Sequence, residues 1–452
     1  MSKSDIYEVS GFSFSYPSAE RKIVLEGSFT VEESSTVLIS GNSGSGKSTL
    51  LYALKGLIPD VIFGKLSGVI LFRGETVSNM WKDPEKRIGI IFQNPSAQMV
   101  CPSVMNELAF GMENLKMKPG DIIDKIYYYA DLFKIQHLLN RKTEELSGGE
   151  KQAIALLSIA AMDCSVYLFD EPTAFLDPER SSHFIDVLGY LMKNKTVIIV
   201  EHNLKYLTGK ISSVLHIENR VIQKKENIIL QTLPVSKRKK SPGKEVMTGI
   251  NICHSYNMKN TVLKNLDFSL HEGEVLGVAG NNGTGKSTLL KIISRILSPL
   301  SGKIIFQGKD ISAIPKKEYY QHLSLLYQNP ESHFLYSTAL QEVQGNTAAL
   351  EKFNLIDYRD SNPFTLSEGE KRRLTLAMQW SMNRRIYLLD EPSFGMDFGN
   401  KLILIETINR MADDGCSFII VSHDNEFLQS VSDRRLLLID GAFEPFIDTE
   451  NL

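Results

Sequence analysis

The sequence of 452 residues predicts an α/β fold that occurs twice along the chain. Three observations predict it. A glycine-rich segment links an apolar strand-like run to an apolar helix-like run at 41–49, and the same arrangement returns at 280–288. Apolar runs that end in two adjacent carboxylates follow at 166–171 and 386–391. Further apolar runs end in a histidine at 196–202 and 417–423.

Both glycine-rich segments match G-x-x-x-x-G-K-[ST], the pattern of a phosphate-binding loop between a strand and a helix. Glycines let several backbone N–H groups converge on phosphate oxygens, and the helix N-terminus adds a partial positive charge. We expect the lysine to reach the outer phosphates and the next serine to bind magnesium. The expected nucleotide-binding residues are Gly41, Asn42, Ser43, Gly44, Ser45, Gly46, Lys47, Ser48 and Thr49 in the first copy, and Gly280, Asn281, Asn282, Gly283, Thr284, Gly285, Lys286, Ser287 and Thr288 in the second.

The composition excludes several classes of protein. A net charge of -3, from 50 basic and 53 acidic residues, gives no global electrostatic argument for nucleic-acid binding. Four widely spaced cysteines argue against a disulfide framework or a zinc site and fit a reducing cytosolic setting. Neither a signal peptide nor an apolar run of ~20 residues is visible in the sequence, so a role at a membrane would require a partner.

The segment 234–245 separates the two copies, 1–233 and 246–452. It is polar, basic and interrupted by Pro242 and Gly243, which predicts an exposed linker. Contact of its cations with a membrane surface is the alternative.

A short alternating segment ends in a tyrosine before each phosphate loop, at Tyr16 and at Tyr256. The alternation predicts half-buried strands. We expect each ring to stack on an adenine base; the alternative is that it only covers a strand end.

The adjacent acids Asp170 and Glu171, and Asp390 and Glu391, terminate their strands. Because successive strand residues point to opposite faces, the two acids of a pair are expected to act differently. We expect the aspartate to orient magnesium and the glutamate to polarise the attacking water. A helix cap is the alternative interpretation.

The two histidines, His202 and His423, are expected to hydrogen-bond the terminal phosphate, although a lone strand-end histidine is usually structural. Gln93 and Gln328 precede Asn-Pro and are expected to touch magnesium or the lytic water. Glutamine before Asn-Pro by itself indicates only a turn.

A third type of anion site is predicted at Ser147, Gly148 and Gly149, with Ser367 and Gly369 in the second copy. Backbone amides at a helix start can bind a phosphate. The same residues fit a capping box, since Glu150 lies three residues after Ser147; the two interpretations are compatible.

Phosphate loop, glutamine turn, Leu-Ser-x-Gly-Glu, strand-Asp-Glu-Pro and strand-histidine, in this order, resemble the ATP-binding cassette (ABC) ATPases over nearly the whole chain. The resemblance implies ATP and Mg²⁺ as cofactors, ATP hydrolysis, and domains with a RecA-like mixed-sheet core, an antiparallel β subdomain and a helical signature subdomain. It also implies that the domains close head to tail, so that Ser367 and Gly369 complete the site of Lys47, Ser147 and Gly149 complete the site of Lys286, and Asp177 and Asp397 line the seam.

A narrower resemblance rests on Gln98 and on Asn106 to Gly111, which are similar to the ATPases of energy-coupling factor transporters. It implies a peripheral position on the cytoplasmic face of the cell membrane, an integral-membrane scaffold with coupling helices near the glutamine turns, and a separate substrate-capture subunit. The implied substrate is a vitamin, a precursor such as that of thiamine (hydroxymethylpyrimidine), or cobalt or nickel. The alternatives are a soluble tandem ABC ATPase acting on ribosomes and a sugar or peptide importer ATPase.

The two copies differ in two respects. Glu368 stands where the family usually has glycine, and an inward-facing carboxylate about 5 Å from a phosphate would cost roughly 3 kcal/mol at an effective dielectric near 20. We nevertheless expect a competent, slower site at Lys47. The segment from Gln93 to Ser147 is longer than that from Gln328 to Ser367, so the halves are expected to grip non-equivalent coupling helices.

Overall fold

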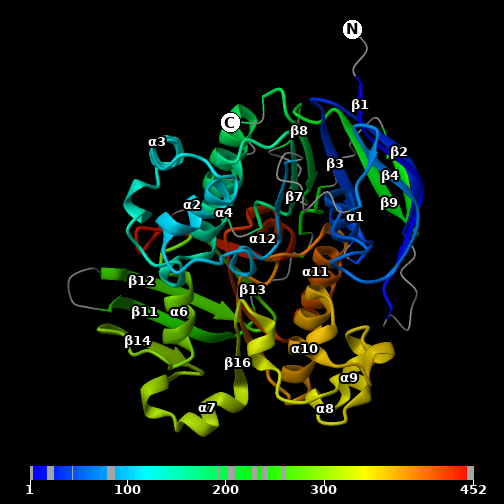
Figure 1. Cartoon of the computed structure of the whole chain (residues 1–452). Coiled ribbons are helices and arrows are strands. Elements are labelled where there is room, and N and C mark those ends of the chain that lie inside the picture. The colour runs from blue at the N-terminus through cyan, green and yellow to red at the C-terminus, as the bar shows by residue number, and fades with distance from the viewer. Residues whose placement is uncertain are drawn as a thin grey trace. The chain divides into compact units, whose positions relative to one another are not determined.

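The computed structural model describes residues 4–17, 25–42, 44–78, 87–174, 176, 178–191, 193–201, 207, 209–225, 232–236, 238, 243–256 and 261–444. The chain forms two compact units, unit 1 (Met1–Leu230) and unit 2 (Gln231–Leu452). Each unit contains sheets and packed helices, which confirms the predicted α/β fold (Figure 1).

The sheet of unit 1 has the strand order β5-β4-β1-β2-β10-β9-β3-β8-β7-β6. Strands β6, β7, β8, β3 and β9 pair in parallel and form the core; β1, β2 and β4 pair antiparallel. The strands are β1 (Asp5–Ser15), β2 (Leu25–Glu32), β3 (Thr36–Gly41), β4 (Lys65–Phe72), β5 (Glu75–Thr76), β6 (Ile88–Ile91), β7 (Val166–Asp170), β8 (Thr196–Val200), β9 (Ser213–Glu218) and β10 (Val221–Lys225).

Unit 2 repeats this plan with two separate sheets, β12-β11-β14-β15 and β16-β17-β18-β13-β19-β20. The first is antiparallel, and the second is parallel from β16 to β19. The strands are β11 (Glu245–Ser255), β12 (Thr261–His271), β13 (Val275–Ala279), β14 (Ser301–Phe306), β15 (Lys309–Asp310), β16 (Leu323–Leu326), β17 (Ile386–Asp390), β18 (Ser417–Ser422), β19 (Arg434–Ile439) and β20 (Ala442–Glu444).

Helices pack against these sheets and against one another. Unit 1 contains α1 (Lys47–Lys55), α2 (Val104–Asn114), α3 (Pro119–Leu132), α4 (Gly148–Ala161) and α5 (Pro178–Leu191). Unit 2 contains α6 (Lys286–Ile293), α7 (Lys316–His322), α8 (Ala339–Glu342), α9 (Thr347–Lys352), α10 (Glu368–Ser381), α11 (Phe398–Asp413) and α12 (Asn425–Val431). The insert between glutamine turn and signature is α2 and α3 in unit 1, but only the shorter α8 and α9 in unit 2.

The parallel strands determine where the functional residues meet. Strands β7, β8, β13 and β18 are buried along their whole length, which explains their continuous apolar sequences. Because the carboxyl ends of parallel strands lie at one sheet edge, the phosphate loop after β3 and the acids ending β7 reach the same edge. The loop after β13 and the acids ending β17 do so in unit 2.

The expected linker is less exposed than its composition predicted. Arg238 has a side-chain exposure of 10 % and lies 3.5 Å from both Asp413 and Asp433 of unit 2. Its guanidinium also donates to the Gly273 carbonyl. The prediction of exposure was therefore wrong for Arg238, because acidic partners far along the chain bury it. Residues 237 and 239–242 lie outside the described residues.

Candidate functional site

The two phosphate loops share a left-handed glycine directly before their helices. Gly46 and Gly285 have φ of 103° and 104°, a left-handed conformation that favours glycine. They precede α1 and α6, which have no side-chain N-cap, so the first N–H groups of each helix are available to an anion. A Cβ at Gly41 would lie 2.6 Å from the Ile217 carbonyl oxygen, which explains why this position is small. Ser43 lies outside the described residues.

The loop lysines fold over their own loops. Lys47 Nζ donates to the carbonyls of Gly41 (2.9 Å) and Asn42 (3.0 Å). Lys286 Nζ donates to those of Gly280 (2.6 Å) and Asn281 (3.0 Å). Both lysines are only 6 % exposed. Each loop therefore holds a buried cation beside amides that can bind phosphate, and a triphosphate fits this arrangement.

Both expected adenine-stacking residues lie beside their phosphate loops. The hydroxyl of Tyr16 is 3.0 Å from Oγ1 of Thr49, and that of Tyr256 is 3.0 Å from Oγ1 of Thr288. The hydrogen bond anchors each ring through the first turn of the loop helix. Stacking on adenine stays a prediction.

Glu391 lies in a dense set of contacts in unit 2. Its carboxylate is 3.3 Å from Lys286 Nζ and accepts hydrogen bonds from Ser422 Oγ (2.8 Å) and the His423 backbone N–H (3.1 Å). Nδ1 of His423 lies 3.0 Å from Oε2. Burial raises the pKa of Glu391, but His423 and Lys286 outweigh this effect and hold the pKa below its usual range. The ionised form is therefore favoured, as a proton acceptor requires.

Asp390, the neighbour of Glu391, behaves differently. Burial raises the pKa of Asp390, although a hydrogen bond with Ser287 opposes the shift. The Asp390 carboxylate and the Ser287 hydroxyl are oxygen ligands of the kind that Mg²⁺ prefers. These two side chains fit a magnesium ion beside the loop, and a bound cation would favour ionised Asp390.

The corresponding acids of unit 1 have different partners. Nε2 of Gln93 donates to Oε2 of Glu171 at 2.9 Å, so two expected catalytic residues meet. Glu201 occupies the position that Ser422 has in unit 2, and it accepts a hydrogen bond from Thr173 Oγ1 at 2.7 Å. Asp170 is buried at the end of β7.

His202 and Asp177 lie outside the described residues, whereas Asp397 caps α11.

The side chains of the two acids in each pair diverge, but strand alternation, the predicted reason, is not the cause. Strands β7 and β17 end at Asp170 and Asp390, and the next residues, Glu171 and Glu391, have φ of 49° and 48°. The prediction from strand alternation was therefore wrong about the cause, because a left-handed backbone turn redirects each glutamate. Such conformations are costly for a residue other than glycine and concentrate at functional sites.

The signature segments are capped helix starts, as predicted. Ser147 and Ser367 are the N-caps of α4 and α10, and each forms a complete capping box with Glu150 or Glu370. At Gly369, a Cβ would overlap the Asn400 side chain, so close packing against α11 requires glycine there. Gly148 and Gly149 begin α4.

Glu368 has a side-chain exposure of 44 % and lies 3.4 Å from Lys371 Nζ.

A sequence profile of the ABC transporter family matches residues 25–174 and 263–394, more than half of the chain. The chain belongs to the ABC transporter family. A Bacillus subtilis protein with the provisional name HMP/thiamine import ATP-binding protein YkoD is 30% identical, covering 96% of this chain and 90% of the relative. A Treponema denticola protein, provisionally named ABC transporter ATP-binding protein, is 28% identical over 96% of this chain and 95% of its own length.

Solved structures similar to this ABC protein also contain ABC domains in tandem. The RNase-L inhibitor aligns with a TM-score of 0.69 at 21% identity, covering 97% of this chain and 91% of that one. Archaeal ribosome recycling factor aABCE1, solved with ribosomal stalk protein aP1, aligns with a TM-score of 0.66 at 23% identity, covering 91% and 85%. These likenesses confirm the fold of two ABC ATPase domains. Membership of the family implies ATP binding, typically with Mg²⁺, and ATP hydrolysis.

Sequence reasoning missed a supporting role that Gln98 and its counterpart His333 share in the two ABC domains. Gln98 Oε1 accepts from the Phe92 N–H (3.2 Å), and His333 Nε2 accepts from the Tyr327 N–H (3.1 Å). Each side chain thus holds the backbone of the residue that precedes the turn glutamine, Phe92 or Tyr327. Because Gln98 and His333 differ in type, only their equal distance from Gln93 and Gln328 could have indicated a shared role.

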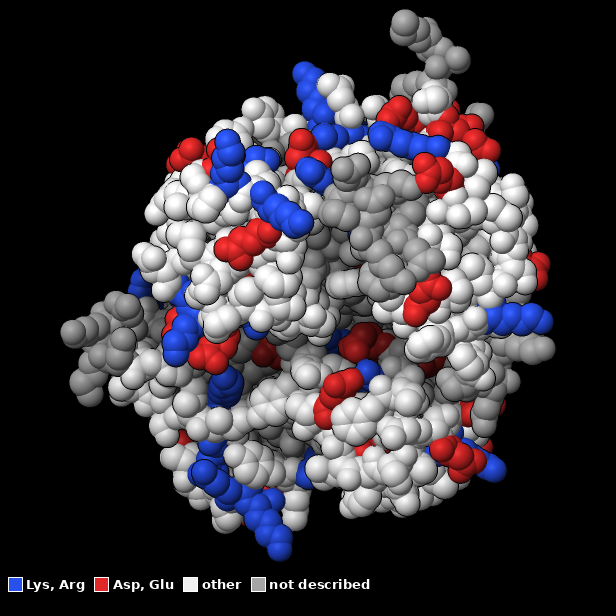
Figure 2. Space-filling model, in the orientation of Figure 1, with Lys and Arg blue, Asp and Glu red and all other residues white. Residues whose placement is uncertain are grey.

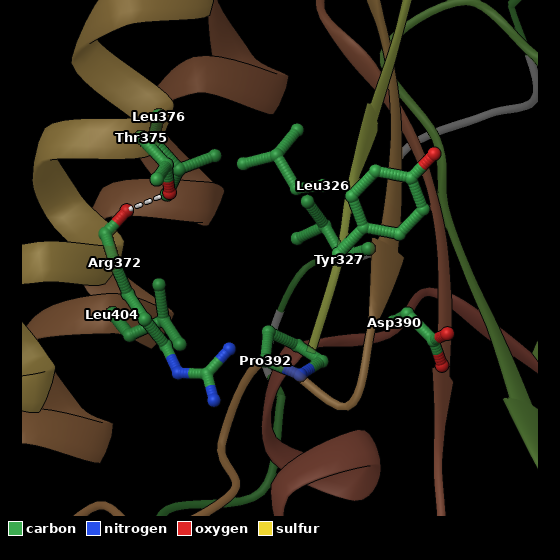
Figure 3. A pocket seen from close by; sticks show the side chains of 9 residues that line it. Leu326, Tyr327, Arg372, Thr375, Leu376, Asp390, Pro392 and Leu404 are labelled. Atoms are coloured by element: carbon green, nitrogen blue, oxygen red, sulfur yellow. Dashed lines mark hydrogen bonds between the residues drawn. The ribbon is translucent and has the colours of Figure 1, made fainter. Parts of the chain in front are cut away.

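Arg372 is another residue that sequence reasoning passed over. It is buried, donates to the Phe394 carbonyl at 3.2 Å, and lines a small cavity of about 20 Å³ with Asp390 (Figure 3). Burial lowers the pKa of Arg372 to about 10, although the nearby negative charges of Glu368, Glu391 and Asp390 oppose this shift. Arg372 therefore places a buried cation near the acids of unit 2; the corresponding residue of unit 1 is Gln152.

Gln328 is exposed in the glutamine turn.

No helix within the described part of the chain has both the length and the apolar character needed to cross a membrane.

Proposed function

We propose that this chain is the ATP-binding and ATP-hydrolysing subunit of a multi-subunit membrane importer of the energy-coupling factor type. Its substrate would be a vitamin, a vitamin precursor such as hydroxymethylpyrimidine, or cobalt or nickel. Full-length similarity to a protein named for HMP/thiamine import supports this proposal. So do Gln98 and the Asn106 to Gly111 segment that follow the first glutamine turn.

One observation carries the proposal of a membrane partner. Large apolar side chains stand exposed just after both glutamine turns: Val100 is 63 % and Leu335 is 82 % exposed. The backbone on which they sit is held by a buried carboxylate. Glu107 accepts from the N–H of Val100 (2.9 Å) and the next residue, and Glu342 accepts from the N–H of Leu335 (2.6 Å) and the next residue. We take these two held apolar side chains as the centres of the docking surface, because contiguous exposed apolar surface marks sites of interaction with proteins or membranes.

The proposed partner is an integral-membrane scaffold whose coupling helices would bury these apolar side chains, working with a separate substrate-capture subunit. Acidic and basic side chains are mixed on the described surface in view, which favours apolar contacts over a single-sign attraction (Figure 2). The chain would then lie peripherally on the cytoplasmic face of the membrane, without a nucleic-acid partner.

The two units would bind different coupling helices of the membrane scaffold. Around the insert of unit 1, Phe110, Ile123 and Tyr127 are exposed on α2 and α3. In the described residues of unit 2 the short α9 stands in place of α3, and Tyr336 and Phe364 are exposed, the ring of Phe364 packing against Phe334. Because the apolar side chains differ in number and position, one coupling helix would not fit both surfaces equally.

The residues of each site would share the work of hydrolysis. Bound magnesium would neutralise charge on the outer phosphates; Ser48, Asp170 and Gln93 would hold it in unit 1, and Ser287, Asp390 and Gln328 in unit 2. Glu171 and Glu391 would accept a proton from the attacking water, and His202 and His423 would contact the terminal phosphate. By family resemblance, Ser147 and Gly149 would contact the nucleotide held by Lys286, and Ser367 and Gly369 that held by Lys47.

Co-purification tests the importer role. The chain is expressed with the membrane proteins encoded beside it, and the detergent-solubilised membrane fraction is assayed for the tagged chain. Val100→Asp with Leu335→Asp should abolish recovery from membranes while ATPase activity persists. Val69→Asp, a change at another exposed apolar side chain on strand β4, is the matched control and should behave as wild type. Recovery of the double variant at the wild-type level would refute the proposed docking surface.

A soluble ATPase acting on ribosomes is the second candidate. Its support is the tandem fold shared with the ribosome recycling factor, at an identity that indicates the fold alone. Sedimentation of the chain with ribosomes from a lysate, dependent on a non-hydrolysable ATP analogue and without recovery from membranes, would favour this candidate over the importer.

A further inference from the structure

Lys371 lies between two carboxylates at the start of the signature helix α10. Its Nζ is 2.5 Å from Oε1 of Glu331 and 3.4 Å from Oε1 of Glu368. The lysine side chain is 9 % exposed, whereas Glu331 and Glu368 are 39 % and 44 % exposed. A buried ammonium therefore joins the segment after the glutamine turn to the first turn of α10.

Unit 1 contains the same link without either acid. Lys151 occupies the position of Lys371, and its Nζ donates to Ser96 Oγ at 3.2 Å. Ser96 and Glu331 are each the third residue after their turn glutamine, and Gly148 stands where unit 2 has Glu368. A single ammonium that donates to a hydroxyl in unit 1 thus corresponds to a three-charge cluster in unit 2.

We propose that Lys371 is a positioning residue that makes the acidic signature of unit 2 compatible with a nucleotide phosphate. This inference rests on the proposed role of Ser367 and Gly369 in phosphate binding. The ammonium holds the Glu368 carboxylate to one side of the helix start and offsets its charge, so that the amides around Gly369 still attract an anion. Glu331, 2.5 Å from the same ammonium, keeps the lysine in place.

This arrangement has a specific consequence for mutants. Lys371 is needed because Glu368 is present; once Glu368 becomes glycine, as in unit 1, the need for the lysine charge disappears. A lysine that only stabilised the fold would be needed in both backgrounds. The coupling between positions 368 and 371 therefore separates the two roles.

The test measures steady-state ATP hydrolysis of the full chain for Lys371→Met, Glu368→Gly, and the double variant, each combined with Glu391→Gln so that hydrolysis reports the Lys47 site. We expect Lys371→Met to lower kcat/KM about tenfold, a factor that corresponds to about 1.4 kcal/mol. The double variant should return to within about twofold of Glu368→Gly. The matched control is Lys151→Met, whose neighbour is Gly148; it is combined with Glu171→Gln so that hydrolysis reports the Lys286 site, and it should stay within about twofold of Glu171→Gln alone. Lys371→Arg should retain activity.

Two results would overturn the proposal: a double variant as impaired as Lys371→Met, or an equal loss in Lys151→Met. Thermal unfolding of each variant identifies loss of fold, and Lys371→Gln, which can still hydrogen-bond Glu331, replaces Lys371→Met if the latter does not fold. A wild-type chain that neither binds nor hydrolyses ATP would refute the proposed ATPase and this inference together. A hydrolysing chain without the expected rescue refutes only the role of Lys371.

Discussion

Lys286 and Glu391 form an ion pair across 3.3 Å in unit 2, and both side chains are more than nine-tenths buried. The pair connects the phosphate loop to the acid that we expect to activate water. Glu391→Gln preserves the shape of the side chain but removes the proton acceptor, so ATP turnover should fall by about 100-fold or more at this site. Measurement of ATP hydrolysis together with ATP binding distinguishes a catalytic loss from a binding loss.

Glu171→Gln is the matched change in unit 1, where Gln93 holds the carboxylate. We expect it to lower turnover as well, because the signature residues Ser367 and Gly369 are retained. If Glu171→Gln leaves turnover unchanged while Glu391→Gln abolishes it, the Lys47 site is inert and the expectation of two competent sites fails.

The depressed pKa of Glu391 predicts a pH dependence of stability. Burial opposes ionisation of Glu391, but His423 and Lys286 outweigh it, so the folded pKa lies below the unfolded value of about 4.3. The resulting stabilisation is fully present above pH 4.3 and is lost as the pH falls through the folded pKa. The stability advantage of wild type over Glu391→Gln should therefore shrink on acidification, which urea denaturation at a series of pH values measures. An advantage that grows below pH 4 would contradict the assignment.

The buried carboxylates Glu107 and Glu342 should each stabilise the loop after a glutamine turn. Alanine at either position leaves two backbone N–H groups without their acceptor, so we expect a loss of about 2 kcal/mol in the free energy of unfolding. Chemical denaturation checks this, with Glu144→Ala, at a largely exposed side chain, as control. Equal effects for Glu107 and Glu144 would show that the contacts contribute nothing measurable.

Gly369 should not tolerate a side chain while Asn400 is present. Gly369→Ala would push its Cβ against the Asn400 amide and displace the start of α10 from α11. We expect lower ATPase activity and a lower melting temperature, both partly restored in Gly369→Ala with Asn400→Ala, because the smaller residue makes room. Absence of any recovery in the double variant would place the cause elsewhere, in the signature amides themselves.

The tyrosines next to the phosphate loops should bind adenine by their rings rather than by their hydroxyls. Tyr16→Ala and Tyr256→Ala should each weaken ATP binding by about 1 to 3 kcal/mol, the usual value of a base stack. Tyr16→Phe keeps the ring and loses only the bond to Thr49, so it should bind nearly as wild type. A fluorescent ATP analogue measures the affinities. Equal weakening by phenylalanine and alanine would rule out stacking as the main contribution.

The sequence by itself determined the repeated α/β fold, the two phosphate loops, the acids at the strand ends and the capped signature helices. These features are local: a glycine pattern, a buried strand or a capping box involves residues close together along the chain. The spacing between Gln328 and Ser367 also predicted the shorter insert of unit 2.

Only the tertiary structure decided which partners these residues have. Lys286, Ser422 and His423 gather around Glu391 because parallel strands bring distant carboxyl ends to one sheet edge. Glu331 meets Lys371, and Arg238 becomes buried beside Asp413, through similar long-range packing. No periodicity encodes such contacts, because they depend on how separate elements pack. Glu368 and Lys371 are three residues apart and were both visible in the sequence, whereas the second carboxylate at this lysine, Glu331, became visible only in the fold.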